Sequence, residues 1–121
     1  MKKKILLADD DKELNEGITE ILTDEGFEVC SVNSGTEAVR KAVFESFDLA
    51  VLDYKMPGLD GLETLAELRK KDPALRAIMI SGKPFIENIT ENEGITYGIA
   101  YAFSKPFDIP AFIKAVKKTC R

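Results

Sequence analysis

Residues 48–53 read DLAVLD, and this stretch decides the fold class of the chain. A nearly continuous apolar run of this length is typical of a strand that is buried on both faces of a sheet. The run ends at Asp53, where a turn with the sequence Lys55-Met56-Pro57-Gly58 begins. Because strands buried on both faces belong to parallel sheets covered by helices, the stretch predicts an α/β protein with a carboxylate at the exposed end of a central strand.

Four further apolar runs predict strands, and patterns of helical spacing separate them. These strands are Lys4–Ala8, Phe27–Val32, Ala77–Ile80 and Ala100–Ser104. Regular alternation of strands and helices predicts one domain over residues 1–121, built as a doubly wound parallel sheet with right-handed crossovers. With the strand order 2-1-3-4-5, the strand order reverses between the first and third strands, and ligands bind at the carboxyl ends of the strands next to this point.

Capping residues and apolar stripes set the predicted helices. The first helix ends before Gly26, and its apolar face comprises Leu14, Ile18, Ile21 and Leu22. The second begins at a capping box of Ser34 and Glu37, and its stripe comprises Ala38, Val39, Ala42, Val43 and Phe47. The third begins at a capping box of Asp60 and Glu63, is closed by Pro73, and buries Leu62, Leu65 and Leu68. A short helix is expected over Phe85–Glu93, and the last one over Ile109–Thr119, capped by Asp108 and burying Phe112, Ile113 and Val116.

Composition excludes several classes of function. The chain has no histidine, which removes Ser-His and Cys-His nucleophiles and histidine-based metal sites. Its net charge of −4 argues against nucleic acid as a partner. The apolar run behind Lys2-Lys3-Lys4 is too short for a secretory segment or a membrane span. Cys30 and Cys120 match no metal or redox spacing, so a cytoplasmic location is expected.

Polar side chains of complementary chemistry end four of the predicted strands. The first strand ends at Asp9 and Asp10, the third at Asp53, the fourth at Ser81 and the fifth at Lys105. Two carboxylates at 4 Å repel each other by about 1 kcal/mol in water and by about 4 kcal/mol at a surface-like dielectric, so a cation is expected among them. Oxygen ligands of this kind favour Mg²⁺. A carboxylate can attack a phosphoryl group, and a lysine and a hydroxyl can bind the phosphoryl oxygens. These residues therefore predict phosphoryl transfer to a carboxylate side chain.

Four motifs in this order resemble those of the receiver domain of two-component response regulators. They are LADD at residues 7–10, LDYKMPGLDG at 52–61, ISG at 80–82 and SKPF at 104–107. The resemblance covers essentially the whole chain, and residues 103–118 look most like the stand-alone, single-domain receivers of sporulation phosphorelays. It implies the flavodoxin-like (βα)5 fold.

The resemblance also implies roles for the acidic residues. Asp53 would accept a phosphoryl group from a phosphohistidine on a sensor histidine kinase or a histidine phosphotransfer protein. Asp10, Asp53 and the backbone carbonyl of Lys55 would ligate Mg²⁺, and Asp9 would reach the ion through water. The protein would then be a phosphoacceptor that signals, rather than an enzyme that acts on other substrates.

For the other end of the site, the resemblance implies that Ser81 and Lys105 bind the phosphoryl oxygens. Lys105–Pro106 would be a cis peptide. Asp11 follows the two site aspartates in the sequence, and we expect it to cap the first helix.

The chain departs from the pattern of the family at three places. Ala102, between Tyr101 and Phe103, stands where the family has an aromatic residue that switches rotamer on activation. The connection between the fourth and fifth strands is longer than expected by about two residues. Gly82 replaces the usual alanine and leaves access to the phosphoryl position more open.

The chain ends after its last predicted helix, so we expect an output through protein contact with a downstream target or through onward phosphoryl transfer. Leu14, Phe107 and Pro110 are expected to dock the partner around the acidic pocket. One alternative is a receiver-like adaptor that works without phosphorylation, although all five polar site residues are present. A second is an aspartyl phosphatase of the haloacid dehalogenase type, which needs an acid where this chain has Lys55. A third is a flavin-binding module, but no phosphate-binding loop follows the first strand.

Overall fold

The computed structural model describes residues 2–82 and 98–120. Its five-stranded sheet is parallel throughout and has the order β2-β1-β3-β4-β5, which confirms the predicted topology. The strands are β1 (Lys4–Ala8), β2 (Glu28–Val32), β3 (Leu49–Asp53), β4 (Ala77–Gly82) and β5 (Tyr101–Lys105). The helices of the described part are α1 (Lys12–Asp24), α2 (Gly35–Phe44), α3 (Gly61–Lys71) and α6 (Ile109–Thr119). None of these helices is long and apolar enough to cross a membrane.

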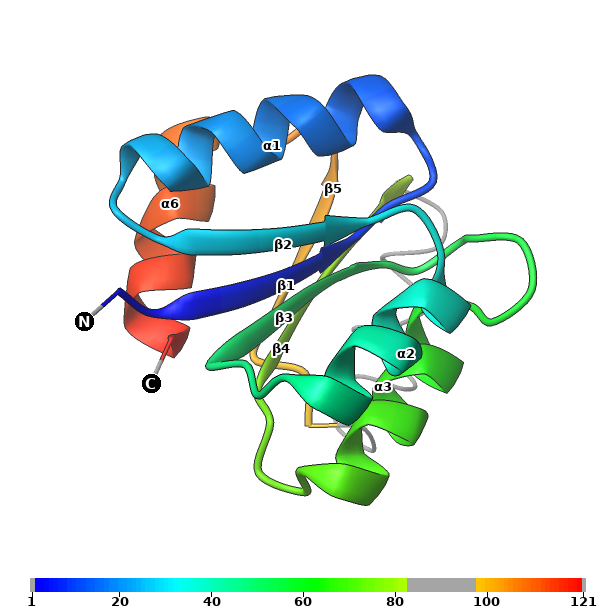
Figure 1. Cartoon of the computed structure of the whole chain (residues 1–121). Coiled ribbons are helices and arrows are strands. Elements are labelled where there is room, and N and C mark those ends of the chain that lie inside the picture. The colour runs from blue at the N-terminus through cyan, green and yellow to red at the C-terminus, as the bar shows by residue number, and fades with distance from the viewer. Residues whose placement is uncertain (1, 83–97, 121) are drawn as a thin grey trace.

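Helices cover both faces of the sheet, with α1 and α6 on one face and α2 and α3 on the other (Figure 1). Side chains of β1 alternate between the two layers, so that Ile5 and Leu7 pack toward α1 and α6, while Leu6 packs toward α2 and α3. Every residue of β3 is buried, as its continuous apolar sequence predicts. Packing in the two core layers fixes the position of each strand along the sheet. It thereby also fixes the position of the polar residue at the end of the strand.

Local capping fixes two of the helix starts as predicted. The side chain of Asp11 accepts a hydrogen bond from the backbone N–H of Leu14 at 3.2 Å, so this acid caps α1. Asp60 and Glu63 form a complete capping box at α3, with side-chain to backbone distances of 2.8 and 3.0 Å. Because α3 starts at a defined residue, the loop between Asp53 and Asp60 also has a defined length.

The capping predictions for α2 and α6 are only partly right. Ser34 accepts a hydrogen bond from the N–H of Glu37, but the Glu37 carboxylate accepts from the N–H of Asn33 rather than from that of Ser34. The second hydrogen bond of the expected capping box is therefore made by the residue before the N-cap and not by the N-cap itself. Asp108 occupies the N-cap position of α6 without a side-chain hydrogen bond to the helix, and Pro110 at the start of this helix removes one of the donors that a cap would satisfy.

Several extents also differ from the predictions. β2 and β3 each begin one residue later than expected, at Glu28 and Leu49, and β5 is shifted by one residue to Tyr101–Lys105. Val43 is 60% exposed and lies outside the core, and α2 ends at Phe44, so Phe47 is buried from the following loop rather than from the helix. The fourth strand continues beyond the apolar run to Gly82, because its residues 81 and 82 still pair with β5. The predicted helix over Phe85–Glu93 lies outside the described residues.

Candidate functional site

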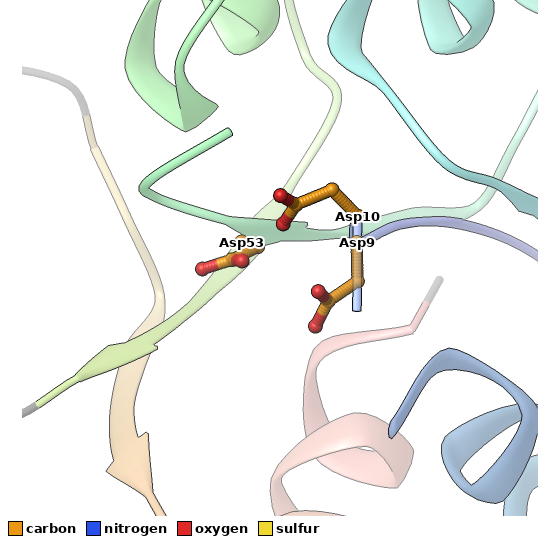
Figure 2. A group of neighbouring side chains, drawn as sticks. All are labelled: Asp9, Asp10 and Asp53. Carbon is orange, nitrogen blue, oxygen red and sulfur yellow. The ribbon is translucent and has the colours of Figure 1, made fainter. Parts of the chain in front are cut away.

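Three carboxylates lie together where β1 and β3 end. The two strands are neighbours, and Ala8 pairs with Leu52, so the residues that follow each of them emerge at the same level of the sheet. One carboxylate oxygen from each of Asp9, Asp10 and Asp53 lies within 4.8 Å of the other two. Figure 2 shows the three side chains side by side at the strand ends. Asp9 and Asp53 are buried and Asp10 is exposed, so the group opens to solvent on one side.

Hydrogen bonds to neighbouring elements hold Asp9 in place. Its Oδ1 accepts from the N–H of Asp11 at 2.9 Å, and its own N–H donates to the carbonyl of Val32 at the end of β2, at 3.2 Å. The buried amide of Asn15 donates to the Asp9 carbonyl at 3.1 Å and to the Val32 carbonyl at 2.8 Å. Asn15 thus joins α1 to two strand ends. This role of Asn15 was not predicted, although a polar residue three positions before Ile18, on the buried side of α1, indicates one.

The ammonium group of Lys105 lies between two of the carboxylates. Its Nζ is 3.1 Å from Asp9 Oδ2 and 3.2 Å from Asp53 Oδ2. The contact with Asp53 is a hydrogen bond, whereas Asp9 Oδ2 is buried without a hydrogen-bond partner among the described residues, although the ion pair with Lys105 remains. One positive charge therefore serves two buried acids.

These contacts shift the acid–base behaviour of the site. Burial, together with repulsion from Asp9, raises the pKa of Asp53 to about 7 from its ordinary 3.8, although Lys105 opposes the rise. Burial lowers the pKa of Lys105, but the charges of Asp53 and Asp9 outweigh that effect and leave it above its ordinary value. Lys105 thus stays protonated at neutral pH, whereas Asp53 titrates near neutral pH.

A cavity of about 470 Å³ opens over these residues. It is lined by Asp10, Asp53, Lys55, Met56, Pro57, Ser81, Gly82 and Lys105. All of the predicted site residues except Asp9 line this cavity, and the carboxylate of Asp9 lies within 4.8 Å of those of Asp10 and Asp53. The buried hydroxyl of Ser81 lies on β4, and Lys105 on β5 precedes the cis peptide to Pro106 that the family resemblance implied.

Gly61 sets the close packing beneath Asp53. Its N–H donates to the Tyr54 carbonyl at 2.7 Å. A Cβ at this position would lie 2.6 Å from the backbone oxygen of Asp53 and 2.6 Å from Met79 Sδ, so only glycine lets the start of α3 approach β3 this closely. Gly61 belongs to the LDYKMPGLDG motif, but the motif alone does not indicate this packing role.

Ala102 lies on the face of β5 that packs toward α2 and α3. Phe103, one residue further, packs toward α6 on the other face, with its ring centroid 5.6 Å from that of Phe112. Tyr101 stacks on Phe103 at 6.3 Å. Neither flanking ring therefore replaces the aromatic side chain that the family has at the position of Ala102.

The donor set suits a hard divalent cation. It contains three carboxylates, and the backbone carbonyl of Lys55 belongs to a residue that lines the same cavity. One ammonium group is shared by two buried carboxylates, and the pKa of Asp53 stays raised in spite of it, so the group holds more negative charge than Lys105 alone neutralises. Oxygen ligands with room for water favour Mg²⁺ over softer metals.

Comparisons with known proteins agree with this geometry. The family model described as the response regulator receiver domain matches residues 5–117. The chain is 33% identical over 118 residues to the sporulation initiation phosphotransferase F of Bacillus subtilis, across 98% of this chain and 94% of that protein. It is 38% identical to a transcriptional regulatory protein CpxR homolog of Haemophilus influenzae, of which it spans only 50%. Among solved structures, that of the response regulator TrrA from Thermotoga maritima in complex with Mg²⁺-BeF has a TM-score of 0.85 and 30% identity, across 98% of this chain and 99% of that one.

Proposed function

This chain belongs to the response regulator receiver domain family, and from this premise we propose that Asp53 accepts a phosphoryl group from a phosphohistidine. The donor would be a sensor histidine kinase or a histidine phosphotransfer protein. Residues 1–121 would act as one receiver domain that passes the signal on by contact with a downstream protein or by onward phosphoryl transfer. Cys30 and Cys120 match no metal or redox spacing, which fits a reducing compartment, and we place the protein in the cytoplasm.

The observation that carries the proposal is the buried Asp53 carboxylate at the mouth of a cavity, with a protonated lysine 3.2 Å away. In the transfer, an oxygen of Asp53 forms a bond to phosphorus, the bond from phosphorus to the histidine nitrogen of the partner breaks, and the imidazole leaves with the electron pair. The product is an acyl phosphate on Asp53. Since the carboxylate must be ionised to attack, its raised pKa in the metal-free protein opposes the reaction near neutral pH.

Asp10, Asp53 and the carbonyl of Lys55 would hold Mg²⁺, and Asp9 would reach it through water. Bound there, the ion would neutralise charge on the phosphoryl oxygens and keep the Asp53 carboxylate ionised. Lys105 is already held beside Asp53, so its ammonium can follow the developing negative charge with little movement. The Ser81 hydroxyl, on the neighbouring strand, would donate to another phosphoryl oxygen. The Mg²⁺-BeF complex of TrrA supports a site of this kind in a relative.

Partner docking would use the side of the cavity formed by α1 and the connection from β5 to α6. Leu14 and Phe107 are half-buried there, against the core that includes Phe112, while Pro110 is exposed. Because Leu14 and Phe107 also support the core, their truncation would lower stability as well as partner contact. A charge placed at exposed Pro110 tests docking with less effect on folding.

Intact mass after treatment with acetyl phosphate and Mg²⁺ tests the proposal. We expect a gain of about 80 Da in the native protein and none in Asp53→Asn. Beryllofluoride with Mg²⁺ should shift the NMR signals of residues around the cavity in the native protein only. Native protein that neither gains mass nor binds beryllofluoride would favour the adaptor that needs no phosphorylation, and steady hydrolysis of a generic phosphate ester would favour the phosphatase.

A further inference from the structure

The outer edge of β2 carries backbone groups that pair with no other strand of the described sheet. β2 is an end strand and pairs only with β1. The N–H of Glu28 donates to Lys3, and the carbonyl of Val32 accepts from Asp9, so the even-numbered residues of β2 face β1. Val29 and Ser31 therefore direct their N–H and C=O groups outward. An edge of this kind can accept another strand.

A groove of about 280 Å³ lies beside this edge on the α1 side, and it is acidic. Ser31 forms its sheet side, and Glu16, Glu20 and Asp24 project from α1 along it. Within the described residues, these three carboxylates make no ion pair. The α1 groove thus presents uncompensated negative charge.

A second groove, of about 490 Å³, lies beside the same edge on the α2 side, and its net charge is positive. Among its described lining residues, Glu37 is the one acid; it accepts a hydrogen bond from the Asn33 N–H at 2.7 Å and keeps its charge, so two positive charges stand against one negative charge. Arg40 and Lys41 make no ion pair with any residue that the structure describes. Phe44 lines the same groove and is 86% exposed. The α2 groove thus combines positive charge with one open aromatic ring.

Ser31 lines both grooves, and the two grooves therefore meet at the open edge of β2. Successive side chains of a strand point to opposite faces, so a strand added at this edge would place alternate side chains in the acidic and the basic groove. We propose that the β2 edge binds an extended segment of a partner protein in which basic side chains alternate with acidic or apolar ones. Backbone hydrogen bonds to Val29 and Ser31 supply the register, and the two grooves select the sequence.

A second copy of this chain does not meet these requirements. Antiparallel pairing of two β2 strands across a two-fold axis keeps both α1 helices on one face of the joined sheet. The acidic α1 groove would then adjoin its own copy, and the basic α2 groove would do the same, which opposes like charges on both faces. Charge complementarity therefore favours a different chain.

A synthetic peptide of about seven residues, long enough to span the strand, provides the probe. Lysine alternates in it with glutamate, and one glutamate is replaced by phenylalanine. We expect the amide NMR signals of Val29 and Ser31 to shift and to gain protection from hydrogen exchange as the peptide is added. A peptide of the same composition with its lysines grouped together is the control, and it should bind at least tenfold more weakly.

Charge reversal on the protein tests the sequence selection. The Arg40→Glu and Lys41→Glu double variant alters only exposed side chains of α2 and should bind the alternating peptide at least tenfold more weakly at low salt. Lys114→Glu with Lys118→Glu makes the same change of net charge on exposed positions of α6 and should bind normally. Equal binding of the two peptides, or equal binding by the two double variants, would overturn the proposal. Dimerisation that protects Val29 and Ser31 without peptide would overturn the choice of partner.

Discussion

Replacement of Asp53 by asparagine should stabilise the metal-free protein by an amount that grows as the pH rises. Asp53 is buried, and its pKa is raised from 3.8 to about 7 by that burial and by repulsion from Asp9. Between these two pH values the folded protein keeps a proton that the unfolded chain has released. Stability is therefore lost as the pH rises through this window, and asparagine, which does not ionise, removes the loss.

The size of the effect follows from the shift itself. One pKa unit corresponds to about 1.4 kcal/mol, so the whole shift corresponds to about 4 kcal/mol between pH 4 and pH 7. An experiment between pH 5 and pH 8 covers about two units of that window, for an expected effect of about 2 to 3 kcal/mol. Groups whose pKa is lowered on folding, such as the half-exposed Glu45 beside Lys4, act in the opposite direction, but they are common to both proteins and cancel in the difference.

Urea unfolding in the presence of a chelator, followed by far-ultraviolet circular dichroism at several pH values, measures the difference. We expect the free energy of unfolding of the native protein to fall, relative to that of Asp53→Asn, as the pH rises from 5 to 8. Addition of Mg²⁺ at pH 8 should restore much of the loss in the native protein and little in the variant. Asp24→Asn, at an exposed position of α1, is the control and should follow the native curve. Parallel curves for native and Asp53→Asn protein across the whole range would refute the reasoning.

Two matched pairs of substitutions test the packing and the positioning of the site. Gly61→Ala should lower the free energy of unfolding by about 1 to 3 kcal/mol, because the new Cβ meets backbone and sulfur atoms at 2.6 Å. Gly17→Ala should raise the free energy of unfolding by about 0.5 to 1 kcal/mol, because nothing lies within 4 Å of the new Cβ. Urea unfolding compares the two, and equal effects would contradict the packing argument. Asn15→Leu should cost about 1 to 3 kcal/mol and also weaken Mg²⁺ binding in an NMR titration, since the carbonyl of Asp9 loses its donor. Thr119→Val, an equally buried position remote from the site, should lower stability and leave Mg²⁺ affinity unchanged, and unchanged affinity in Asn15→Leu would contradict its positioning role.

The sequence predicted the topology because each strand carries its signal locally. The buried run of β3 and the acid at its end are visible in six consecutive residues, and the other strands repeat the pattern. The ends of the elements depend on partners that are distant in sequence. The ladder continues past the apolar run to Gly82 because that residue pairs with Lys105. Likewise α2 ends where the ammonium of Lys71, on α3, donates to the carbonyls of Ala42, Val43 and Glu45.

The candidate site likewise has features that the sequence indicates locally and features that depend on elements distant in sequence. Asp9, Asp53 and Lys105 could be selected from the sequence because each ends a strand, and parallel strands end at the same edge. Nothing local indicates that one ammonium group lies between two buried carboxylates, because that depends on how β5 is placed two strands away from β3. The link from Asn15 to two strand ends is of the same kind, since it exists only once α1 packs over them.

The aromatic residues near Lys105 connect β5 to α6. Alanine at position 102 leaves the face of β5 toward α2 and α3 without a ring in this strand, so a rotamer change there has no aromatic side chain to act through. Phe103 and Phe107 lie two residues on either side of Lys105 in the sequence, and both pack on Phe112 of α6, with ring centroids 5.6 and 4.9 Å away. The two rings also contact each other at 5.8 Å. Because closely packed rings transmit small displacements, movement of Lys105 toward a phosphoryl group would be felt first by α6 rather than through position 102.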